Sequence, residues 1–175
     1  MNRLLSVAAL ALMVAFGSMA CDDDGPTDPS GQPDPEFRAT LSSANEVPPV
    51  SNAEAGASGV MNVTFVVTRD GAGAITGGTA NFNGTLTGFP AGTAITAAHI
   101  HTGSAGVNGG VLVNLALSPG EVTLANGSGT IVKNNIALTA DIANQIVGNP
   151  AAFYFNAHTA ANPGGAVRGQ LVATN

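Results

Sequence analysis

The chain has 175 residues, of which 45% are hydrophobic and only 9% are charged, with 23 glycines and 10 prolines. This low charge disfavours a bundle of long amphipathic helices, because such helices need charged, solvent-facing sides. Five cations against eleven acids also argue against a nucleic-acid partner, because neutralising several phosphates needs more Lys and Arg. A small all-β domain with tight turns fits this composition.

The start of the chain has the pattern of an export signal. Arg3 precedes an apolar stretch over residues 4–16, which is long enough for a signal peptide but short for a membrane span. Small residues then lead to Cys21, the only cysteine, in a pattern that resembles a bacterial lipobox with Ser18 where leucine is usual. We expect a signal peptide over residues 1–20 and lipidation of Cys21, with ordinary signal cleavage as the alternative. The protein is then exported and lipid-anchored in the cell envelope, facing the periplasm or the cell surface.

Residues 21–36 form an acidic, proline-rich segment with six of the eleven acids and four of the ten prolines. A stretch without aliphatic side chains cannot bury enough apolar surface to offset the entropy lost on ordering. We interpret it as a solvated tether between the lipid and a domain over residues 37–174. A calcium site in the acidic run is an alternative, but the run lacks the glycine spacing of a calcium loop.

Period-two alternation of apolar and polar residues predicts short strands throughout the domain. The expected strands are residues 37–42, 60–68, 79–88, 93–101, 110–117, 127–133, 151–159 and 166–173. Turn signals rich in Gly, Pro, Asn and Asp separate them, at residues 69–71, 77–78, 89–92, 126–127 and 162–165.

One segment instead favours a short helix over residues 139–147. Thr139 is an N-cap candidate, Asp141 lies in the first turn, and Gly148 and Pro150 supply the stop. Together these patterns predict an all-β fold, an antiparallel Greek-key β-sandwich of about 7–8 strands with one short helix.

All three histidines fall in two of the predicted strands. Residues two apart in a strand share a face, so His99 and His101 project together while Ile100 points to the other side. In the later strand, His158 and Asn156 share the polar face. If the two strands are neighbours, three imidazoles converge on a site that suits Cu or Zn and leaves a fourth position open. The alternative is that these histidines are exposed, or hold loop backbone through their ring nitrogens.

Three motifs in order resemble the CHRD domain, which is named for the extracellular protein chordin and also occurs in secreted microbial proteins. They are SANEVPPVSNAEAGASG, AHIHTGSAGVNGGVLVNL and FYFNAHTAANPGGAVRGQL, at residues 43–59, 98–115 and 153–171. The resemblance spans nearly all of residues 41–172. One departure is FNAHT, where the family more often has an aromatic-Val-Asn-Val-His-Thr strand, but His158 still aligns. The resemblance implies an all-β extracellular domain and leaves the biochemical activity open.

Three further side chains are candidates for supporting roles. Glu46 precedes two prolines that fix the backbone, so we expect its carboxylate to pair with Arg168 or to accept a hydrogen bond from a histidine. Arg168 follows the turn at residues 162–165 and lies in an apolar strand. Asn156 is expected to support the metal ligands indirectly. The glycine-rich loop at residues 103–110 is interpreted as a connector, with closure over a site as the alternative.

No motif for a catalytic nucleophile, a phosphate loop or a metalloprotease is present. Three histidines are too few for the bimetallic site of Cu,Zn superoxide dismutase. The leading hypothesis is a non-catalytic, envelope-anchored CHRD module that binds a protein partner or a single Cu or Zn ion outside the cytoplasm. The alternatives are a mononuclear copper redox protein using the same histidines, and a structural or adhesive surface domain.

Overall fold

The computed structural model describes residues 31–175, so the expected signal peptide, Cys21 and most of the tether lie outside the described residues. The described strands and helix are β1 (Glu36–Ser42), β2 (Ser58–Arg69), β3 (Ile75–Thr87), β4 (Thr93–Thr102), β5 (Val111–Asn114), β6 (Val122–Leu124), β7 (Gly129–Thr139), α1 (Ala140–Gly148), β8 (Phe153–Thr159) and β9 (Val167–Ala173). Two 3-10 turns, η1 (Ser43–Asn45) and η2 (Pro150–Ala152), flank the strands β1 and β8. From residue 31 onward, no helix is both long and apolar enough to cross a membrane.

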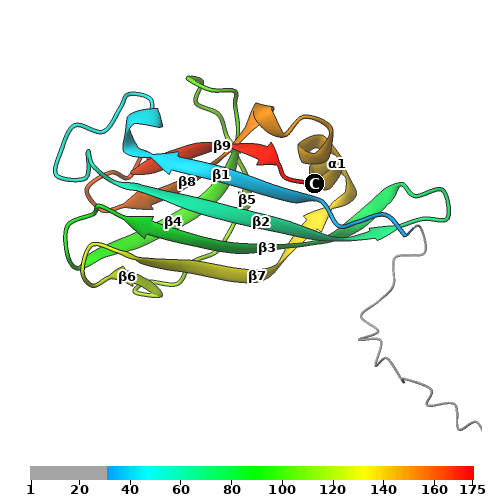
Figure 1. Ribbon diagram of the computed structural model, residues 1–175, viewed down its shortest axis with the longest axis horizontal. Helices are drawn as coiled ribbons and strands as arrows, with labels where there is room; N and C mark the ends of the chain where they lie inside the picture. Colours follow the sequence, from blue (N-terminus) through cyan, green and yellow to red (C-terminus); the bar gives the residue numbers. More distant parts are fainter. Residues whose placement is uncertain (1–30) are drawn as a thin grey trace, which may run out of the picture.

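All strand pairings are antiparallel and join the strands into one sheet with the order β5-β4-β8-β9-β1-β2-β3-β7, while β6 pairs with β4. The sheet folds over itself, so that β1, β2, β3 and β7 form one layer and β4, β8 and β9 lie behind it (Figure 1). The short strand β6 also contacts β7, which nearly closes the two layers into a barrel. The predicted all-β, antiparallel sandwich with one short helix is confirmed.

The core lies between the two layers and follows the alternation of the strands. In β1, every second residue is buried, and Phe37 packs on Phe65 of β2 with ring centroids 4.9 Å apart. Phe82 of β3 and Phe155 of β8 face each other across the layers at 6.3 Å. Burial of such aromatic side chains supplies much of the driving force for folding. It also fixes which face of β8 points away from the core.

The helix α1 begins one residue later than predicted. The Thr139 hydroxyl caps it by accepting a hydrogen bond from the Ile142 N–H at 3.3 Å. Ala143 and Ile146 are buried, and the helix packs against β3 and β7 near the C-terminal end of the chain (Figure 1).

Two sequence interpretations of the strands are wrong. Gly77 and Gly78 do not form a turn but lie inside β3, with φ values of 157° and 155°. A side chain at Gly78 would collide with the Val66 backbone, so glycine here permits a close approach of β2. The turn that joins β2 to β3 lies at the signal predicted at residues 69–71, where the Asp70 carboxylate accepts from two backbone N–H groups. The strand β6 was not predicted, because three residues are too few to show alternation.

The end of the expected tether is joined to the domain. Val67 N–H donates to the Asp34 carboxylate at 3.1 Å, and Phe65 N–H donates to the Pro35 carbonyl at 2.9 Å. The sheet therefore begins at Glu36, before the boundary expected at residue 37.

Candidate metal centre

The two histidine-bearing strands are neighbours, as the metal-site hypothesis requires. β4 pairs with β8 in a register that places His101 opposite Tyr154 and His99 opposite Asn156. Ile100 is fully buried in the core, so the histidines lie on the opposite face of β4. His158 lies on the same face, one diagonal step from His99.

The three imidazoles converge. One ring nitrogen from each of His99, His101 and His158 lies within 4.8 Å of the others. The closest pair is His99 Nδ1 and His158 Nε2, at 3.1 Å. Nitrogens that share a tetrahedral ion at ~2.0–2.1 Å are roughly 3.4 Å apart, so only small side-chain movements separate this cluster from a coordinating one.

Backbone carbonyls fix the protonation of two rings. His101 Nδ1 donates to Gly109 O at 3.1 Å, and His158 Nδ1 donates to Pro163 O at 3.0 Å. Because a carbonyl only accepts, each neutral ring carries its proton on Nδ1 and has its lone pair on Nε2, which in His158 accepts from His99 Nδ1. His101 Nε2 is buried and has no hydrogen-bond partner among residues 31–175, which ordinarily costs about 1–3 kcal/mol. A bound cation would satisfy that orphaned acceptor.

The electrostatics keep the cluster neutral. Burial and the neighbouring His158 and His101 rings lower the pKa of His99 from 6.5 to about 4. Burial also lowers the pKa of His101 and of His158, more than their backbone hydrogen bonds raise it. Neutral imidazole is the form that ligates metals. The lowered pKa values predict that protons compete with a metal ion only at a pH below the ordinary imidazole pKa of ~6.5.

A family model, described as the CHRD domain, matches residues 37–171. The chain belongs to the CHRD domain family. No curated protein and no solved structure is significantly similar to it. The matched range contains the three histidines and every supporting residue proposed from the sequence except Cys21, which precedes it.

In this CHRD domain, the loop at residues 103–110 is more than a connector. Arg168 Nη2 donates to the carbonyls of Ser104 and Val107 at 2.9 and 2.8 Å, and Asn108 Nδ2 donates to Val47 O at 2.7 Å. The loop therefore packs over the histidine-bearing face of the sheet. The polar face of β8 is buried along its whole length, and its Asn156 and His158 also contact Glu46 and Pro163, outside this loop.

The predicted pairing of Glu46 with Arg168 is wrong. Within residues 31–175, the only salt bridge joins Lys133 to Glu121. Arg168 is 1% exposed, and its guanidinium is occupied by loop carbonyls, Asn108 Oδ1 and Gln170 Oε1. The Arg168 side chain lies over the Tyr154 ring, with Cζ 3.4 Å from the ring centroid.

Glu46 contacts Asn156 instead of a cation or a histidine. Asn156 Nδ2 donates to both carboxylate oxygens, at 2.9 and 3.1 Å. Burial raises the pKa of Glu46 from 4.5 to about 7, although Arg168 and the Asn156 hydrogen bond partly oppose this. Asn156 Oδ1 is buried without a partner in the described residues, and no hydrogen bond links Asn156 to a histidine there.

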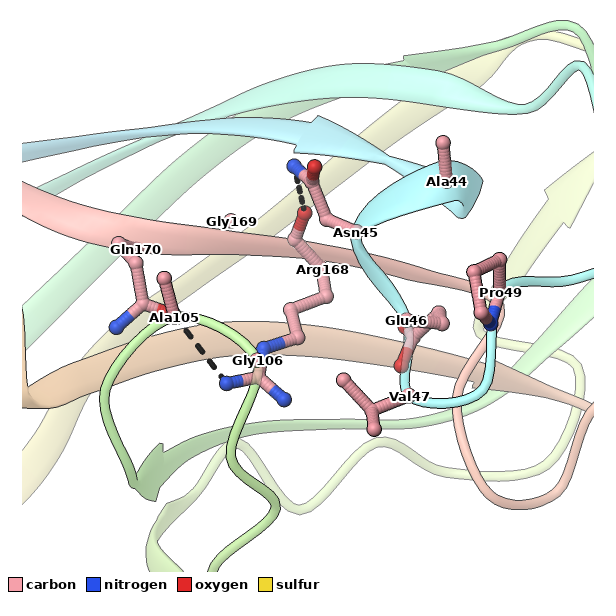
Figure 2. Close-up of a pocket in the computed structure, with 10 residues that line it drawn as sticks. All are labelled: Ala44, Asn45, Glu46, Val47, Pro49, Ala105, Gly106, Arg168, Gly169 and Gln170. Carbon is pink, nitrogen blue, oxygen red and sulfur yellow. Dashed lines mark hydrogen bonds between the residues drawn. The ribbon is translucent and has the colours of Figure 1, made fainter.

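Glu46 and Arg168 also line a cavity of ≈540 Å³. Figure 2 shows Arg168 reaching from β9 towards the loop that carries Ala105 and Gly106, with Glu46 and Val47 on the other side of the cavity.

Sequence reasoning missed Glu54. Its buried carboxylate accepts hydrogen bonds from the Thr159 hydroxyl and from Asn162 Nδ2. These contacts hold the turn that presents the Pro163 carbonyl to His158. The Asn-Pro-Gly-Gly turn was visible in the sequence, but a partner more than a hundred residues away was not.

Proposed function

We propose that this CHRD domain is a binding module that holds one Cu or Zn ion through His99, His101 and His158. The observation that carries the proposal is the buried, unpartnered Nε2 of His101, which lies beside two other imidazoles. Backbone carbonyls orient His101 and His158 from behind, and such outer contacts typically accompany metal-ligating histidines.

The donor set favours borderline metals. Three neutral imidazoles suit Cu and Zn, whereas Mg²⁺ and Ca²⁺ prefer oxygen ligands. The Glu46 carboxylate accepts a hydrogen bond from Asn156, and that of Glu54 accepts from Thr159 and Asn162. Among the described residues, the cluster therefore contains three histidines and no carboxylate. When bound, such an ion offers an open coordination position for an exogenous ligand.

Metal binding should replace the hydrogen bond between His99 and His158. The His158 Nε2 lone pair accepts from His99 Nδ1, so the metal-free cluster is held by an Nδ1–H of His99. To ligate through Nδ1, His99 must carry its proton on Nε2. Because all three rings are already neutral, binding at pH 7 should release almost no protons.

The test is titration of the purified full chain with Zn(II) and Cu(II), by calorimetry and by metal content after dialysis. We expect a single site in the wild type and its loss in His101→Ala. Thr96→Ala, an exposed position on the same strand, is the matched control and should bind as the wild type does. Equal weak binding by the wild type and His101→Ala would refute the proposal. It would leave the histidines as fold elements and favour a structural or adhesive domain.

A mononuclear copper redox protein is the second candidate. His99 is less buried than the other two ligands, which favours access of small molecules to the cluster. The copper-loaded chain, cycled between Cu(II) and Cu(I) by electrochemistry, tests this directly. A reversible Cu(II)/Cu(I) couple, with copper still bound in both oxidation states, would support the redox function. Loss of copper from the protein in either oxidation state would exclude it.

Export and lipid anchoring at Cys21 remain part of the proposal. They rest on the apolar stretch and the position of the single cysteine. A protein partner outside the cytoplasm is compatible with this location.

A further inference from the structure

Tyr154 lies between a buried cation and a candidate metal ligand. The Arg168 Cζ is 3.4 Å from the Tyr154 ring centroid, and the His101 ring stacks on Tyr154 at 4.9 Å with an interplanar angle of 9°. β8 has β9 on one side and β4 on the other, so the two neighbours approach from opposite strands. Cation–π and stacking contacts of this kind are strongest when desolvated, and Tyr154 is 3% exposed.

Tyr154 also reaches His101 through the backbone of the loop. The Gly109 N–H donates to the Tyr154 hydroxyl at 3.3 Å, and the Gly109 carbonyl accepts from His101 Nδ1 at 3.1 Å. A side chain at Gly109 would collide with the Thr102 backbone, so only glycine lets the loop come this close. The tyrosine thus holds both the ring of His101 and the carbonyl that sets its tautomer.

Arg168 holds the other side of the same loop. Its Nη1 donates to Asn108 Oδ1 at 3.1 Å, and its Nη2 donates to Val107 O at 2.8 Å. Figure 2 shows the Arg168 side chain reaching from β9 to the loop, beside Ala105 and Gly106. The loop is therefore fixed immediately before Gly109, while Tyr154 fixes Gly109 itself.

We propose that Tyr154 is a positioning residue of the metal centre: it holds His101 with its Nδ1–H on Gly109 and its Nε2 lone pair towards the other two histidines. The proposal rests on the proposed metal-binding function. It predicts that metal affinity depends on the Tyr154 ring and hydroxyl, and not only on the three ligands.

The experiment compares three variants of the full chain. Tyr154→Phe removes only the hydroxyl, and Tyr154→Leu removes the stacking as well. Phe153→Leu is the matched control, because Phe153 is the adjacent aromatic of β8, is 6% exposed, and faces the core instead of His101. Zn(II) affinity is measured by competition with a chromophoric chelator, and the Cu(II) form by electron paramagnetic resonance.

We expect Tyr154→Leu to weaken Zn(II) binding by about 10–100-fold and to alter the copper hyperfine splitting. Tyr154→Phe should have a smaller effect in the same direction. Phe153→Leu should lower thermal stability as Tyr154→Leu does, but leave the affinity and the copper spectrum nearly unchanged. Equal weakening in both leucine variants, or none in either, would overturn the proposal.

A metal-free readout separates this inference from the proposed function. In the apo protein, ¹⁵N NMR of the imidazoles should show His101 as the Nδ1–H tautomer in the wild type and a mixture of tautomers in Tyr154→Leu. If the wild type binds no metal but this change occurs, the metal-binding function fails and Tyr154 still positions His101. If the tautomer is the same in both proteins, the positioning role is wrong whatever the metal result.

Discussion

Replacing Glu46 with glutamine should change how the stability of the protein responds to pH. Glu46 is 6% exposed, and burial raises its pKa from 4.5 to about 7. A raised carboxyl pKa means that the folded state binds the proton more tightly than the unfolded state. The associated stability is complete below pH 4.5 and is lost as the pH rises through 7. Glutamine keeps the carbonyl that accepts from Asn156 but cannot ionise.

The magnitude follows from the shift. The pKa of Glu46 rises from 4.5 to about 7, and at 1.36 kcal/mol per pKa unit this amounts to about 3 kcal/mol of folding stability. Of this stability, roughly 2.5 kcal/mol is lost between pH 5 and pH 8. The free energy of unfolding of Glu46→Gln, minus that of the wild type, should rise by this amount across the interval. The histidine contributions are common to both proteins and cancel in the difference.

Urea denaturation at pH 5 and pH 8, with a chelator present to keep the protein metal-free, measures this difference. Glu121→Gln is the control, because Glu121 is exposed and its pKa is lowered by Lys133 and Ser118. The stability due to that carboxylate is already present above its unfolded pKa of 4.5, so the difference between Glu121→Gln and the wild type should hardly change from pH 5 to pH 8. Parallel pH profiles for wild type and Glu46→Gln would refute the reasoning.

Three further predictions concern other parts of the protein. Arg168→Ala should lower the free energy of unfolding by about 3–5 kcal/mol, because buried loop carbonyls lose their donors; a loss under ~0.5 kcal/mol in urea denaturation would contradict this stabilising role. Zn(II) affinity measured by calorimetry should fall at a pH below the ordinary imidazole pKa of ~6.5, because burial lowers the pKa of His99, His101 and His158; a fall centred on ~6.5 would contradict the lowered pKa values. Cys21→Ser should move the protein from the membrane fraction to the soluble fraction, and an unchanged distribution would contradict lipidation.

Local patterning was sufficient to predict most of the strands and the shared face of the histidines. His99 and His101 are two residues apart, and alternation alone places them together once β4 exists. The helix was predictable because Thr139 and Gly148 mark its ends by local chemistry. These signals depend on neighbours along the chain, and the sequence displays such neighbours directly.

Contacts distant in sequence were harder to predict. Glu46 and Arg168 looked like partners because they are opposite charges near the same motifs, yet the nearest acceptors for the guanidinium are neutral. Which of several polar groups a buried cation meets depends on the path of the loop at residues 103–110. That path follows from tertiary packing, and the many glycines of the loop leave it undetermined locally.

The buried guanidinium explains how loops are held in a chain whose only cysteine is Cys21, so that no intrachain disulfide can form. Burying a cation without an anion is costly unless other groups replace its hydration. Here the replacements are two carbonyls, two amide oxygens and the face of Tyr154. Each of these groups belongs to the loop, to β9 or to the tyrosine that stacks on His101. The same contacts that solvate Arg168 therefore hold the loop down and orient a candidate metal ligand, so loss of the cation should loosen the loop and the site together.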